Sequence, residues 1–245
     1  MVNIDTVYQR VLAIANKEQR GYITPLEFNL MANQAQLAVF EQYFYDINQN
    51  ERSHGNSRQY SDIEHIMNEK IAVFAIELGL TVVNLGHILP RDCYVLGSVM
   101  FIDNKGVRRE CEEISSAEFL RICNYPLTAP TNIRPVYIRY RSPGQTSGIE
   151  SGIRVYGDGC EIIRNSIRCN YIKLPDKVEW GYDVIAEKAL YNATPGRTVH
   201  FEHHPSEETE LVLKILELAG IIINKPGLVQ VAAQEDIKKI QQEKA

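Results

Sequence analysis

The sequence predicts an α+β fold: a helical bundle formed by N- and C-terminal helices, with an inserted, mostly antiparallel β region. Two observations give this prediction. Apolar residues recur with a helical period near both ends of the chain. Between them, short apolar or β-branched runs alternate with Gly, Pro, Asn and Asp. We therefore assign residues 1–80 and 200–245 to the helical bundle and residues 81–199 to an inserted β-rich region.

Length and charge restrict the possible function classes. The chain has 245 residues, enough for one large domain or two smaller ones, and a formal net charge of -5. The negative net charge argues against a nucleic-acid-binding protein. It is still compatible with a protein surface that DNA passes along with only weak interaction. No apolar run reaches the roughly 20 residues that cross a bilayer, and there is no signal-peptide layout. We therefore expect a cytoplasmic product.

The first 46 residues predict two consecutive antiparallel helices. Gly21 is placed to end the first helix because glycine readily adopts a positive φ. Thr24, Pro25 and Glu27 then give an N-cap, a first helical position and a capping box, so a second helix should extend to about Asp46. The first helix is indicated by apolar residues on one face: Ile4, Val7, Tyr8, Val11, Leu12, Ile14 and Ala15.

The turn between these two helices imitates a calcium-binding EF-hand loop. Gly21 falls at the sharp-turn position and Glu27 at the closing bidentate position. However, the early ligand positions hold Asn16, Glu18 and Arg20, so a cation would meet a guanidinium group. Glu27 is also explained by the capping box. We therefore interpret this stretch as a capped turn without a metal.

The middle of the chain predicts strands interrupted by one short helix. Ser61 caps a predicted helix from Asp62, although residues 71–74 are equally consistent with the start of a strand. Ser115 or Ser116 caps a two-turn helix. The lone Trp180 is interpreted as a packing anchor. Strands are expected at residues 81–85, 94–102, 107–110, 136–140, 152–156, 161–164, 166–173 and 198–202.

Two further helices are predicted near the C-terminus. Pro205 opens the first of them, its opening turn is acidic, and Gly220 is expected to end it. Pro226 opens the second, whose apolar stripe either packs in the subunit's own bundle or reaches a neighbour. We favour a neighbour because the stripe thins towards the terminus. The predicted partner-contact residues are Leu228, Val229, Ala232, Ile237 and Ile240.

The cysteines predict neither a disulfide framework nor a zinc site. They are odd in number and scattered, with no close pair of the metal-binding kind. Buried or half-buried reduced thiols are the expected state. The five residues are Cys93, Cys111, Cys123, Cys160 and Cys169.

One cluster has spacing that would suit a metal. On a strand, His200 and Glu202 would point the same way, with His203 and His204 following. The chain turns at Pro205 and no distant ligand is evident, so we interpret these residues as capping or exposed. The sequence also contains no nucleophile elbow and no phosphate-binding loop. We predict no catalytic residue, no cofactor and no metal, and therefore not an enzyme.

The two ends of the chain resemble a family. The stretches VNIDTVYQRVLAIANKEQRGYITPLEFNLMANQAQLAVFEQYFYD and HPSEETELVLKILELAGIIINKPGLVQVAAQED together cover about a third of the sequence. They resemble virion structural proteins of tailed bacteriophages of marine bacteria and Bacteroidetes, including crAss-like phages. The resemblance implies a structural subunit near the head-to-tail junction, such as a connector (adaptor) ring protein that joins portal to tail.

The resemblance also implies partners and a location. The partners would be further copies of the chain in a ring, twelvefold by resemblance, together with portal and other tail or ring proteins. Packaged DNA would pass through without sequence-specific binding, and no membrane would be involved. The protein would reside in the virion after assembly in the host bacterial cytoplasm. Two alternatives stay open: another virion protein such as a tail-tube, stopper or decoration protein, or a soluble metal-binding enzyme.

Overall fold

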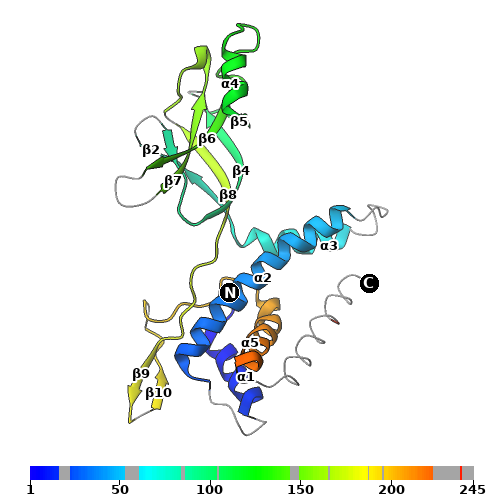
Figure 1. Ribbon diagram of the computed structural model, residues 1–245, viewed down its shortest axis with the longest axis vertical. Helices are drawn as coiled ribbons and strands as arrows, with labels where there is room; N and C mark the ends of the chain where they lie inside the picture. The colour runs from blue at the N-terminus through cyan, green and yellow to red at the C-terminus, as the bar shows by residue number, and fades with distance from the viewer. Residues whose placement is uncertain are drawn as a thin grey trace. The chain divides into compact units, whose positions relative to one another are not determined.

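A computed structural model describes residues 1–16, 23–52, 61–83, 86–103, 105–143, 149–164, 166–186, 188–194, 196–222 and 238. The chain forms two compact units. One consists of Met1–Val73 with Pro175–Ala245, and the other is Phe74–Leu174. The chain therefore leaves the first unit once, builds the whole second unit, and returns (Figure 1).

The first unit is organised around its last described helix. α5 (Glu208–Ile222) packs against both α1 (Ile4–Asn16) and α2 (Pro25–Arg52), and α3 (Ser61–Ala72) packs on α2 (Figure 1). α5 is preceded by a short 3-10 turn, η2 (Pro205–Glu207), and it continues through Gly220, where the sequence predicted its end. Among the described residues, no helix is long and apolar enough to span a bilayer. Fully buried side chains from these helices include Ile4, Val7, Val11, Phe28, Ala35, Val39, Phe40, Leu211 and Ile215.

α2 begins with the capping box that the sequence predicted. The Glu27 N–H donates to Thr24 Oγ1 at 3.3 Å, and the Thr24 N–H donates to Glu27 Oε2 at 2.9 Å. The Thr24 hydroxyl also donates to Glu27 Oε2, at 2.8 Å. The hydrogen bonds from the Thr24 N–H and hydroxyl stabilise the carboxylate and lower the pKa of Glu27. The calcium-like interpretation has no support from this end of the loop, because Glu27 is already bonded to the cap. Gly21 and five other loop positions, residues 17–20 and 22, lie outside the described residues.

Replacing Thr24 with alanine is expected to lower the free energy of unfolding by about 1 kcal/mol, because the hydroxyl that caps α2 is lost. Urea denaturation followed by circular dichroism measures the change. Thr24→Ser keeps the hydroxyl and serves as the control. Equal stabilities of the alanine variant and the wild type would show that the cap is dispensable.

An extended segment at residues 176–180 lies along α2 and is held by side-chain amides. Asn29, Asn33 and Gln36 of α2 bond alternate residues of the segment, at Trp180, Val178 and Asp176 respectively. The geometry matches because about four helical residues rise 6 Å, close to the span of two extended residues. The segment therefore pairs with a helix almost as it would with a strand.

Trp180 confirms the prediction of a packing anchor. Its ring is buried, lies 4.6 Å from the Tyr8 ring between centroids, and its Nε1–H donates to Asp5 Oδ1 at 2.9 Å. Tyr182 and Tyr191 face each other across the hairpin of β9 (Tyr182–Ile185) and β10 (Lys188–Tyr191), and both stack on Trp180 at 5.7 Å. This aromatic cluster fixes the root of the hairpin.

The second unit is a mixed, nearly closed sheet of eight strands in the order β1-β8-β4-β5-β6-β7-β3-β2. The edge strands β1 and β2 are separated in sequence by Leu80 alone, so one stretch of chain forms both edges and the sheet curls into a barrel-like shape (Figure 1). Only β5 and β6 pair in parallel among the described strands. The bounds are β1 Ala75–Gly79, β2 Thr81–Val83, β3 Gly86–Ile88, β4 Cys93–Ile102, β5 Arg108–Glu113, β6 Val136–Pro143, β7 Ile149–Tyr156 and β8 Ile167–Lys173.

Each face of this sheet carries a separate apolar cluster. Alternate residues of β4, β7 and β8 build the larger one, as expected from the two-residue period of a strand. The smaller cluster uses the other face of β6, through Val136 and Ile138, and packs against Phe119 and Ile122 of α4 (Ser116–Cys123). Ser115 caps α4 by accepting from the Glu118 N–H at 3.2 Å, as predicted.

The predicted fold class is wrong. The described residues form mainly a large mixed, nearly closed eight-stranded sheet together with five α-helices, in roughly equal amounts, and not a helical bundle with a subordinate β region. The prediction missed β1, β3 and the β9–β10 hairpin. Residues 161–164 and 198–202, in contrast, form isolated bridges only, at Ile162, Val199 and Phe201. β1 gave no signal because most of its side chains are exposed, so its sequence does not alternate.

The prediction that all cysteines are reduced is also wrong. Cys123 at the end of α4 and Cys160 in the turn η1 (Asp158–Cys160) form a disulfide. Both belong to the second unit, so the bond ties α4 to the turn that follows β7. The two residues are 37 positions apart, and nothing in their local sequence marks them as a pair.

Candidate functional site

The residues of the predicted metal-like cluster have separate partners. His200 Nδ1 accepts from the Ile4 N–H at 3.3 Å, and Glu202 Oε2 accepts from the Asp176 N–H at 3.1 Å. The first bond joins the cluster to the start of α1, and the second joins it to the segment along α2. Neither side chain is directed at a shared centre.

The two histidines that follow, His203 and His204, also lie in different surroundings. His204 Nδ1 accepts from the Ser206 N–H at 3.3 Å and caps η2, as the capping interpretation predicted. His203 is fully buried, which contradicts the prediction of an exposed side chain. No group of three or more His, Cys, Asp or Glu side chains suited to a metal ion occurs in the described part of the chain.

His203 lies in a buried polar cluster that joins three helices of the first unit. The Glu207 carboxylate, 1% exposed, accepts from Lys70 Nζ of α3 at 3.0 Å. Lys70 Nζ also lies 5.8 Å from the centroid of the Tyr43 ring of α2, and that ring lies 6.0 Å from the His203 ring. The buried ion pair therefore links α3 to η2, and Tyr43 places the cluster against α2.

Burial lowers the pKa of His203 to about 4. Removal of the imidazolium from water is the main cause, and the positive N-terminal amino group acts in the same direction, while the negative charge of Glu207 opposes it. His203 is therefore neutral at pH 7. We interpret the cluster as part of the fold, since its charged groups are engaged with each other.

Acidification from pH 6.5 to 4 is expected to lower the free energy of unfolding by about 3 kcal/mol through His203 alone. The unfolded chain takes up a proton near pH 6.5, whereas the folded chain takes it up only near pH 4, so stability is full above 6.5 and is lost below it. Urea denaturation at a series of pH values measures the slope. His203→Phe should flatten this slope, whereas the control His65→Phe, at an exposed histidine, should not. Equal slopes in all three proteins would contradict the assignment.

The remaining cysteines offer no reactive thiol among the described residues. Cys111 and Cys169 are buried, and burial raises their pKa to about 12 and about 11 respectively. Burial and the neighbouring Asp92 also raise the pKa of Cys93. Because the thiolate is the nucleophilic and metal-binding form, these three residues are poorly suited to catalysis or metal binding.

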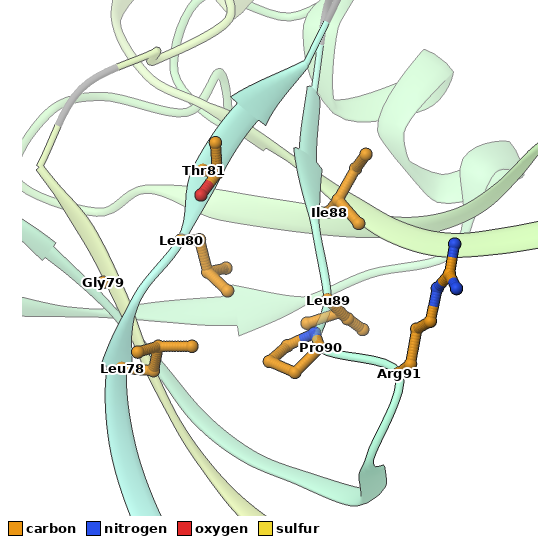
Figure 2. Close-up of a pocket in the computed structure, with 8 residues that line it drawn as sticks. All are labelled: Leu78, Gly79, Leu80, Thr81, Ile88, Leu89, Pro90 and Arg91. Atoms are coloured by element: carbon orange, nitrogen blue, oxygen red, sulfur yellow. The ribbon is translucent and has the colours of Figure 1, made fainter. Parts of the chain in front are cut away.

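A pocket of about 330 Å³ opens in the second unit where two paired strands part (Figure 2). Thr81 and Ile88 form the last rung between β2 and β3. Beyond that rung the Leu80 N–H donates to Ile167 O of β8, while the Leu89 N–H donates to Ser151 O of β7. The two chains therefore follow different partners, and the space between them is the pocket.

The lining of the pocket is aliphatic except at its ends. Four side chains, Leu78, Leu80, Ile88 and Leu89, stand with Pro90 along the two diverging stretches, and Figure 2 shows Thr81 and Arg91 towards the ends. None of the eight lining residues is a histidine, a cysteine or a carboxylic acid. The pocket can therefore provide apolar contact and one positive charge, but its lining holds no group for acid–base or nucleophilic chemistry.

Both units carry large apolar side chains on their surfaces. On α2, Leu26, Leu30 and Leu37 are exposed, on the side of the helix opposite its buried residues. Ala38 of α2 is exposed as well. On the second unit, exposed apolar side chains occur along α4 and the loop that follows it: Leu120, Tyr125, Leu127 and Ile133.

The loop after α4 is held by several bonds. Asp158 accepts from the Asn132 N–H at 2.8 Å and from its side-chain amide at 2.5 Å. The Thr128 hydroxyl donates to Ile122 O at 3.2 Å, and the Cys123–Cys160 disulfide anchors the start of the loop. The exposed apolar side chains are therefore presented on a fixed backbone, as in a preorganised contact surface.

The predicted partner-contact residues Leu228, Val229, Ala232, Ile237 and Ile240 lie outside the described residues. The exposed surfaces of α2 and of the α4 loop were not among the predicted contacts. A helical projection of α2 would have shown the first, since Leu26, Leu30 and Leu37 share one side of the helix. The chain matches no protein-family model and no curated protein.

Proposed function

We propose that this chain is a structural subunit of a tailed-bacteriophage particle, a head-to-tail connector ring protein that surrounds the DNA passage between portal and tail. The observation that carries the proposal is the exposure of large apolar side chains on fixed elements of both units, on α2 and on the α4 loop. Extended apolar surfaces of this kind are typical of protein–protein contact sites.

Two further points support an assembly role. The sequences of both ends resemble virion structural proteins, and they include α1, most of α2 and α5, the helices that build the core of the first unit. The candidate reactive groups among the described residues are also engaged in the fold, since His203, Lys70 and Glu207 form one buried cluster. A binding and assembly function fits these observations better than catalysis.

The proposal is tested by the mass of the purified protein in solution. Light scattering coupled to size-exclusion chromatography should give a multiple of the 27.9 kDa chain, with twelve copies expected from the resemblance, and negative-stain images should show closed rings. A monomer at every accessible concentration, with no binding to the cognate portal protein, would contradict the proposal. Rings that stack into open tubes would instead indicate a tail-tube protein.

The net charge of -5 gives a second expectation within this proposal. A ring that DNA traverses should bind DNA weakly and without sequence preference, because tight phosphate contacts would hinder passage. Fluorescence anisotropy with two duplexes of unrelated sequence measures this binding. Strong, sequence-dependent binding would point to a different role.

A further inference from the structure

α2 is apolar on two opposite sides. One side is buried in the first unit, through residues such as Phe28, Ala35 and Val39. On the other side Leu26 is 65% exposed, Leu30 is 68% exposed and Leu37 is 40% exposed. At about 100° per residue these three leucines fall within an arc of roughly 40°, over about 16 Å of helix. We call Leu26, Leu30 and Leu37 the leucine face.

Single exposed leucines are common, but an aligned row opposite the core is not explained by packing within the subunit. The row is exposed in one copy of the chain, so another molecule would have to cover it. Its border is acidic, because Glu41 is exposed about 20° from Leu30 around the helix. A matching partner would present an apolar stripe of similar length with a basic residue beside it.

The chain itself contains such a stripe. It continues for 23 residues beyond the last residue of α5, Ile222, and most of these lie outside the described residues. In sequence, residues 228–240 place apolar side chains on one side of a helix of about 18 Å, comparable to the length of the leucine face. In this projection Lys239 falls about 20° from Leu228, within one margin of the stripe, so that margin carries a cation that complements Glu41.

We propose that residues 226–242 of one subunit dock as a helix along the leucine face of a neighbouring copy. This inference rests on the proposed function and names the contact that would hold the ring together. An amphipathic helix lying on an apolar row is a recurrent mode of recognition. Because donor and acceptor lie on different parts of the chain, the contact is head-to-tail, which is the type of interface that generates closed rings.

The first test uses Leu30→Glu with Leu37→Glu in the full chain. The doubly substituted protein should elute at the 27.9 kDa mass of one chain, whereas wild type gives the ring. Ala38→Glu is the control, because it places the same charge on an exposed position of α2 outside the leucine face. Circular dichroism confirms that both variants are folded. A ring formed by the double variant would overturn the docking while leaving the proposed function intact.

The second test separates docking between copies from packing within one copy. A chain truncated after Ile222 keeps the leucine face but lacks the donor segment, and the Leu30→Glu, Leu37→Glu chain keeps the donor but lacks the acceptor. Each alone should be monomeric, and their mixture should give a 1:1 complex. The absence of this complex, normal ring assembly of the truncated chain, or loss of its fold would each overturn the inference. A monomeric wild type would contradict the proposed function, and the mixture would still decide whether the contact exists.

Discussion

Replacing Asn33 with leucine is expected to lower the free energy of unfolding by about 3 kcal/mol. The Asn33 amide donates to Val178 O at 2.9 Å, and its carbonyl accepts from the Val178 N–H at 3.0 Å. Val178 is buried, so leucine leaves a buried donor and a buried acceptor without this partner, each at a cost of about 1–3 kcal/mol. Urea denaturation monitored by the fluorescence of Trp180, two residues away, measures the loss.

The matched control is Gln34→Leu, which makes a similar exchange at the neighbouring, exposed position of α2. It should change the free energy of unfolding by less than about 0.5 kcal/mol, as is usual for surface positions. Similar losses in both variants would show that leucine disturbs the helix in general and that the amide pairing contributes little.

Replacing Lys70 with methionine is expected to lower the free energy of unfolding by about 3–5 kcal/mol. Glu207 would keep the hydrogen bond from the Ser206 hydroxyl at 2.9 Å but lose its buried cation. An uncompensated buried carboxylate is costly because the protein interior solvates it poorly. Thermal and urea denaturation both measure the effect.

The double variant Lys70→Met, Glu207→Leu is the informative comparison. Removing both charges should recover much of the lost stability, because an apolar pair of similar size has no desolvation penalty. A double variant as unstable as Lys70→Met alone would indicate that the loss comes from packing around the Lys70 stem and not from the unpaired charge.

Local signals in the sequence were sufficient for the helix starts. Thr24 with Glu27, and Ser115, make the predicted caps because an N-cap depends on residues three positions apart. The helices of residues 4–16 and 25–52 likewise follow from apolar periodicity. α1 and α2 contact each other through the Tyr8 and Phe28 rings, whose centroids are 4.5 Å apart. Both also pack on α5, which begins more than 200 residues from the N-terminus, as expected if the terminal helices pack together.

The sheet and the amide pairing depend on contacts that no local pattern contains. β1 pairs with β8 about 90 residues away, and the barrel-like closure arises because Leu80 alone separates the two edge strands. Asn29 and Asn33 resemble ordinary polar surface positions until the segment at 176–180 is placed beside them. For the candidate site, the predicted contacts after residue 222 remain a prediction, and the leucine face, which a helical projection of α2 shows, was not among the predicted contacts.

The two ends of the inserted unit meet. The Lys173 N–H donates to Phe74 O at 2.9 Å, so the first residue of the second unit is hydrogen-bonded to its penultimate residue. Neighbouring strands lie about 5 Å apart. The distance between Val73 and Pro175, the residues on either side of the insertion, is therefore little more than the distance that a tight turn would span.

This arrangement has a consequence for the order of folding. The core of the first unit needs α5 beside α1 and α2, and closing a flexible loop of about 100 residues to achieve this costs about 3 kcal/mol more entropy than closing a loop of a few residues. If the sheet forms first, Phe74 and Leu174 are already neighbours and that difference disappears. The barrel-like unit then holds together the two points of the chain from which the helices of the first unit continue. Mutations that slow the folding of the barrel-like unit should therefore slow the folding of the first unit by the same factor.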